Sequence, residues 1–192
     1  MKRRISGIGP ALSAALILGL ASTLADFIWD GWIPSHQMVY GLVHGALLLL
    51  LFGLVLGWHS GGGKAILRGA AGGLVIGLVA ASGFYLLAPL VGIAAMFVSW
   101  MAFWLLFGFL HRWLQGNRER LALSALRGVL AALLSGAASY WTIRHLWLQG
   151  GAASDGYAFH LAAWTLAYLP GFLALLISKG EQKRSHAKTQ SH

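Results

Sequence analysis

The stretch MVYGLVHGALLLLLFGLVLGW, residues 38–58, contains no Asp, Glu, Lys or Arg, and its one histidine is His44. A helix that crosses a bilayer needs about 20 consecutive, mainly apolar residues, because each residue advances the helix by about 1.5 Å. Residues 38–58 are therefore long enough and apolar enough to span a membrane. We expect this stretch to form one transmembrane helix.

The remainder of the chain has the same character. Of its 192 residues, 58% are hydrophobic and 10% are charged, and the mean hydropathy is +0.70. An ordinary soluble domain has about 25% charged residues. The sequence therefore predicts an all-α, polytopic integral membrane protein with one domain over residues 1–180 and a basic cytoplasmic tail over 181–192. Its six expected transmembrane helices cover about 5–27, 38–58, 65–87, 90–110, 121–143 and 157–178.

The distribution of Lys and Arg predicts the orientation. Of the 14 cationic side chains, all except Arg144 lie at the chain ends, in the connectors that would share a side with them, or in the part of a span next to such a connector. Cations in short loops are retained in the cytoplasm. We therefore expect a multi-pass protein of the inner (plasma) membrane with both termini cytoplasmic. An alternative for the first span is a cleaved secretory signal, since Lys2, Arg3 and Arg4 precede an apolar run that ends near Ala25.

Composition excludes several classes of function. The absence of cysteine excludes disulfides, thiolate metal sites and cysteine nucleophiles. The net charge of +9 comes from residues at the ends of apolar runs and is not interleaved with aromatics, so we expect no nucleic-acid partner. No phosphate-binding loop or nucleophile elbow is present. Enzymatic activity is therefore less expected than binding or transport.

Small residues at intervals of four predict where helices pack closely, because lipid supplies little hydrophobic force between helices. One such stripe lies in the third segment and one in the fifth, and the two match at a constant offset of 59 residues. This match suggests a duplicated hairpin, 65–110 and 121–178, although similar composition alone would also explain it. The packing residues are Gly69, Gly73, Gly77, Gly128, Ala132 and Gly136.

Polar residues inside or at the ends of spans are functional candidates, because ionisable groups in hydrocarbon are costly. In this chain they gather on the predicted non-cytoplasmic half. Asp26 and Asp30 are four residues apart and would share a helix face; pairing with Arg144 is the structural alternative. The candidates for ligand binding or proton coupling are Asp26, Asp30, His44, Trp100, Trp104, Arg144, His160 and Trp164.

Three kinds of site are compatible with these residues. His44, His160 and Asp26 could hold a divalent metal, although no fixed ligand spacing is present. Haem could be held by His44 with His160, or by His59 with His111. Trp100, Trp104 and Trp164 could line a pocket for an organic molecule.

The overall plan resembles the substrate-binding subunits of energy-coupling-factor vitamin transporters. The likeness rests on the size, the six-span topology and the small residues Ala11 and Ala15 of the first span. It implies a ligand pocket that faces outward, and a partner membrane subunit with ATPases that supply energy. A small transport or ligand-binding subunit is therefore the first expectation. The alternatives are a structural or assembly protein, including a homo-oligomer, and a membrane redox protein with haem or metal bound by histidine.

Overall fold

A computed structural model describes residues 7–32, 37–92, 94–117, 119–142, 145 and 156–176, with the backbone alone for residues 28–32 and 37. Each of its six helices is long and apolar enough to cross a membrane, which confirms the all-helical prediction and indicates a multi-pass membrane protein. The helices are α1 (Ile8–Trp32), α2 (Gln37–Ser60), α3 (Gly63–Val91), α4 (Ala94–Leu114), α5 (Leu121–Thr142) and α6 (Tyr157–Leu176).

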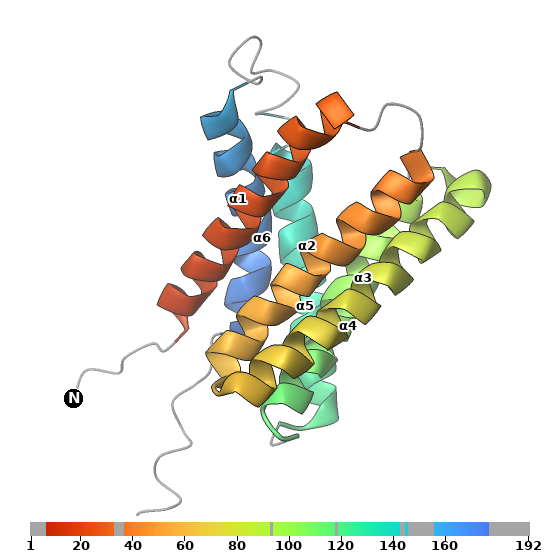
Figure 1. Cartoon of the computed structure of the whole chain (residues 1–192). Coiled ribbons are helices and arrows are strands. Elements are labelled where there is room, and N and C mark those ends of the chain that lie inside the picture. Colours follow the sequence, from red (N-terminus) through yellow and green to blue (C-terminus); the bar gives the residue numbers. More distant parts are fainter. Residues whose placement is uncertain are drawn as a thin grey trace, which may run out of the picture.

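The helices form a bundle in which the first and last are neighbours (Figure 1). Around the bundle the order of extensive contacts is α1, α6, α5, α4, α3 and α2. The closing contact between α2 and α1 is much less extensive than the others. In the part of the chain that the structure describes, helices α1 and α2 are therefore the one pair of neighbours around the bundle that packs loosely.

Helices α2 and α3 pack with their backbones in direct contact. A side chain added at Gly53 would meet the carbonyl of Gly69, and one added at Gly73 would meet the carbonyl of Leu49. Glycine is the one residue without a Cβ atom, so it permits this approach. The stripe predicted in the third segment is thus the surface on which α3 meets α2.

The stripe in α5 faces the preceding helix in the same way. A Cβ atom at Gly128 would lie 2.8 Å from Cα of Leu105 on α4, and one at Gly108 would lie 2.6 Å from the carbonyl oxygen of Ser124. Gly136 differs from the predicted role, because its added Cβ would be 3.8 Å from the Trp100 ring, an ordinary contact. The duplicated hairpin stays a prediction.

Aromatic rings fill the centre of the bundle. Phe52 of α2 contacts Trp104 and Phe107 of α4 and Phe172 of α6, with ring centroids 5.1, 3.9 and 4.5 Å apart. Trp104 is fully buried, and its Nε1 makes no hydrogen bond to any residue that the structure describes. Trp104 therefore occupies the core.

Helices α1 to α4 each end later than the sequence indicated. Helix α1 continues through Asp30 to Trp32, and α3 continues through Pro89 to Val91. Proline is compatible with the last turn of α3, although it cannot donate a backbone hydrogen bond there. Gly92 ends this helix with a φ of 58°, and its N–H bonds to the carbonyl of Ala88. Gly92, and not Pro89, therefore ends this helix.

Candidate functional site

The site is built around Asp26, in the last part of α1. Its Oδ2 lies 2.7 Å from Nδ1 of His160 and 2.6 Å from Nε1 of Trp164, both on α6. A carboxylate only accepts hydrogen bonds, so both ring N–H groups act as donors. The Asp26 side chain is 26% exposed and that of His160 is 12% exposed. A carboxylate in a helix apolar enough to cross a membrane is thus held by two donors from one neighbouring helix.

The same two helices share a second polar contact closer to the middle of the bundle. The hydroxyls of Ser22 and Tyr168 lie 3.1 Å apart, and both side chains are buried. Thr165 packs against Gly19, where an added Cβ would collide with the threonine side chain. Together with Asp26, His160 and Trp164, these residues form a row that we call the α1–α6 polar seam.

Aromatic rings surround the polar seam. Phe27 lies 3.9 Å from the Tyr157 ring and 4.9 Å from the His160 ring, measured between centroids. Deeper in the bundle, Tyr168 stacks on Trp164 at 5.8 Å and on Trp100 at 6.0 Å. These rings reduce the local dielectric constant, so the hydrogen bonds to Asp26 are stronger than they would be in water.

A cavity of about 280 Å³ lies between α1 and α2, where these two helices pack loosely. Its walls are almost entirely apolar, and among the described residues that line it only His44 is polar. The His44 ring stacks on Tyr40, with centroids 5.8 Å apart. The cavity is lined by Ala21, Leu24, Ala25, His44, Leu47, Leu48 and Leu51.

Helix α1 therefore takes part in both features. Ala21 and Ala25 face the cavity toward α2, whereas Ser22 and Asp26 face α6. Both pairs have the spacing of four residues that places side chains on one helix face. The polar seam fixes α1 to α6, and the adjoining face of α1 is left to line the cavity.

The structure brings together only part of the predicted site. Asp26, His160 and Trp164 are in contact, and His44 lies across α1 on the cavity side. Trp100 and Trp104 do not line this cavity. Three of the predictions concern residues outside those that the structure describes: the side chain of Asp30, Arg144 as its partner, and the tail over 181–192.

The proposed metal and haem ligands have other contacts. Among the residues whose side chains are described, no three His, Asp or Glu groups lie close enough together to hold a metal ion. At the other end of the bundle, Nε2 of His59 is 3.5 Å from the Ser13 hydroxyl, and Nε2 of His111 is 2.9 Å from Nε2 of Gln115. These histidines are therefore engaged in polar contacts within the bundle.

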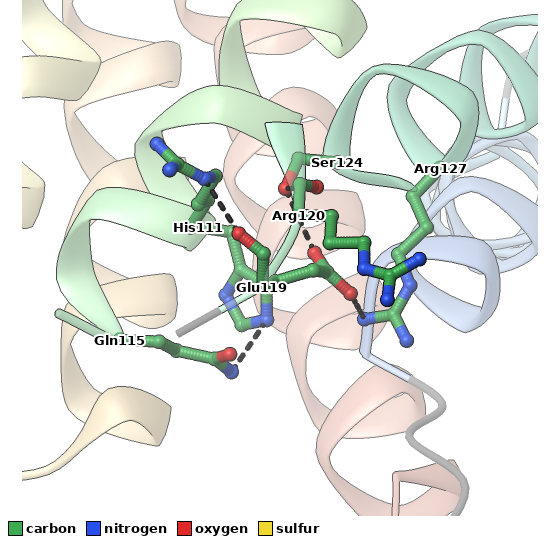
Figure 2. A network of polar contacts seen from close by, with 7 residues as sticks. His111, Gln115, Glu119, Arg120, Ser124 and Arg127 are labelled. Atoms are coloured by element: carbon green, nitrogen blue, oxygen red, sulfur yellow. Dashed lines mark hydrogen bonds and ion pairs between the residues drawn. The ribbon is translucent and has the colours of Figure 1, made fainter. Parts of the chain in front are cut away.

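A second polar network, absent from the candidates drawn from the sequence, joins α4 to α5 (Figure 2). Glu119 accepts a hydrogen bond from the Ser124 hydroxyl at 2.9 Å and pairs with Arg127 at 2.9 Å. Its backbone carbonyl accepts a hydrogen bond from Arg112 at 2.8 Å. The signal in the sequence was a single acid, Glu119, in a connector otherwise rich in arginine.

Sequence reasoning also missed Ser22 and Tyr168. The available signal was spacing, because Ser22 and Asp26 are four residues apart, as are His160, Trp164 and Tyr168. Two matching polar stripes of this kind suggest a pair of facing helices.

Comparisons with protein-family models, with curated proteins and with solved structures find no match for this chain.

Proposed function

We propose that the protein is a small membrane transport or ligand-binding subunit whose ligand occupies the α1–α2 cavity, next to the polar seam. Asp26 is the observation that carries this proposal. A carboxylate in a membrane-spanning helix is costly and marks a functional site by default. Here it is held by His160 and Trp164 and remains 26% exposed.

The cavity indicates the class of ligand. Apolar walls with few polar groups are typical of sites for small organic molecules. The cavity of about 280 Å³ is near the lower end of the usual range of about 300–1,000 Å³. The ligand is therefore a small, mainly apolar molecule with one polar group, which His44 contacts.

The orientation follows from the cation distribution. The end of the bundle with Asp26 and His160 is opposite the arginine-rich connector between α4 and α5. Since cationic loops stay in the cytoplasm, the Asp26 end faces away from it, with both termini inside the cell. In a transporter, a partner membrane subunit supplies the energy, in keeping with the resemblance to energy-coupling-factor subunits.

The test is retention of the ligand by a cavity-filling variant. The protein is purified from its native membrane in mild detergent, and bound small molecules other than bilayer lipids are quantified by mass spectrometry. We expect one compound, close to one per chain, in the wild type. Leu47→Trp is expected to lose it, because the larger side chain fills the cavity.

Leu78→Trp on α3 is the matched control. Leu78 is 44% exposed and Leu47 is 52% exposed, but Leu78 does not line the cavity. This control should retain the compound. A wild-type protein without a bound small molecule, or equal retention by Leu47→Trp, would contradict the proposal.

A further inference from the structure

A second concave surface lies between α5 and α6, away from the cavity and the polar seam. It encloses about 460 Å³ and is apolar except for Arg127. Four leucines of α5 form one wall and three residues of α6 form the other. The groove is lined by Leu123, Leu126, Arg127, Leu130, Leu134, Pro170, Leu173 and Ala174.

The dimensions of the groove match one leaflet of a bilayer. From Leu123 to Leu134 the helix advances by about 16 Å, and one leaflet contributes about 15 Å of hydrocarbon. The α5 leucines are exposed. An extended acyl chain is thus the apolar group that fits the groove.

The charge at the end of the groove indicates the headgroup. Arg127 pairs with Glu119, but Arg112 and Arg120 belong to the same α4–α5 junction, as Figure 2 shows for Arg120. Among the described residues of this junction, three guanidinium groups thus accompany one carboxylate, an excess of two positive charges. Basic pockets between membrane helices on the cytoplasmic side bind anionic lipid headgroups.

We propose that an anionic phospholipid binds in the α5–α6 groove, with its phosphate at Arg127 and an acyl chain along the α5 leucines. The guanidinium of Arg127 has five N–H donors in a planar fork. It can therefore donate to the phosphate while its ion pair with Glu119 persists. This proposal does not depend on the ligand of the α1–α2 cavity.

Native mass spectrometry of the delipidated full chain tests the site. Phosphatidylglycerol and phosphatidylcholine with the same acyl chains are added separately. We expect phosphatidylglycerol to bind about fivefold more tightly, the factor given by about 1 kcal/mol for one arginine near an anionic headgroup. Glycerol 3-phosphate, which has no acyl chain, should not compete with it.

Variants test the contact with the headgroup and the contact with the acyl chain separately. Arg127→Gln should reduce phosphatidylglycerol binding to the level of phosphatidylcholine, and Arg127→Lys should keep much of the preference. Leu130→Trp should weaken phosphatidylglycerol binding by filling the groove, and Leu78→Trp on α3 should not. If Arg127→Gln does not fold, Leu130→Trp decides, since it leaves the ion pair with Glu119 intact.

Equal binding of the two lipids by the wild type would overturn the proposal. An unaltered affinity in Leu130→Trp would do the same, because the acyl chain would then lie elsewhere. Full competition by glycerol 3-phosphate would show a site for a free phosphate compound and would also overturn it.

Discussion

Gly73→Leu is expected to prevent α2 and α3 from packing and to destabilise the protein by about 3 kcal/mol or more, the upper end of the cost of overpacking. The added side chain would meet the carbonyl of Leu49 and the backbone of Gly53. Backbone atoms in a helix do not move aside as a side chain can, so the two helices must separate. The measurement is the thermal unfolding of the detergent-solubilised protein, followed by size-exclusion chromatography.

Gly83→Leu on the same helix is the control, since an added Cβ at Gly83 meets nothing within 4 Å. Both changes raise intrinsic helix propensity by a similar amount, so they differ in packing alone. Gly83→Leu should unfold close to the wild-type temperature. Equal unfolding temperatures for the two variants would contradict the packing of α2 on α3 described above.

Asp26→Leu is expected to have the second large effect, because His160 and Trp164 lose the acceptor that they share. Removing the acceptor of a buried donor costs about 1–3 kcal/mol. The variant should therefore unfold at a clearly lower temperature than the wild type. It should also lose the bound small molecule, since α1 is no longer fixed to α6.

Asp26→Asn separates the effect of losing the hydrogen-bond acceptor from the effect of losing the negative charge. The amide keeps the size and one acceptor oxygen of the carboxylate, so most of the stability should remain. The small molecule should be retained, since Asp26 does not line the cavity and the amide keeps α1 fixed to α6. If Asp26→Leu unfolds at the wild-type temperature, the polar seam does not hold α1 against α6.

The six helices could be predicted from hydropathy because every backbone polar group in lipid must be bonded within its own helix. A long apolar run therefore has one structural outcome, whatever its neighbours are. Helix ends are less determined, as α3 shows by continuing through Pro89 to Val91. There, the local geometry of Gly92 decided the boundary.

The faces by which the helices meet could be predicted only in part. Gly73 and Gly136 belong to similar stripes, yet only Gly73 lies against a neighbouring backbone. Likewise, Trp100 and Trp104 are four residues apart, but Trp104 is buried in the core while Trp100 stacks on Tyr168. Such differences depend on how all six helices pack, which no single segment encodes.

The candidate site shows the same limit. Asp26 and His160 were identified by their cost in a membrane, which is a local property. Their contact joins residues that are 134 positions apart, and it follows from the packing of α1 against α6. The cavity beside His44 arises from the weak contact between α1 and α2 and has no signal in the sequence.

The central claim, that the site at Asp26 faces away from the cytoplasm, is tested most directly by labelling single cysteines. The chain has no native cysteine, so Gly156→Cys at the start of α6 and Gln115→Cys after α4 each provide one thiol. Intact and permeabilised cells are treated with a membrane-impermeant maleimide. We predict labelling of Gly156→Cys in intact cells and of Gln115→Cys only after permeabilisation. The reverse pattern would contradict the orientation, and with it the outward-facing site.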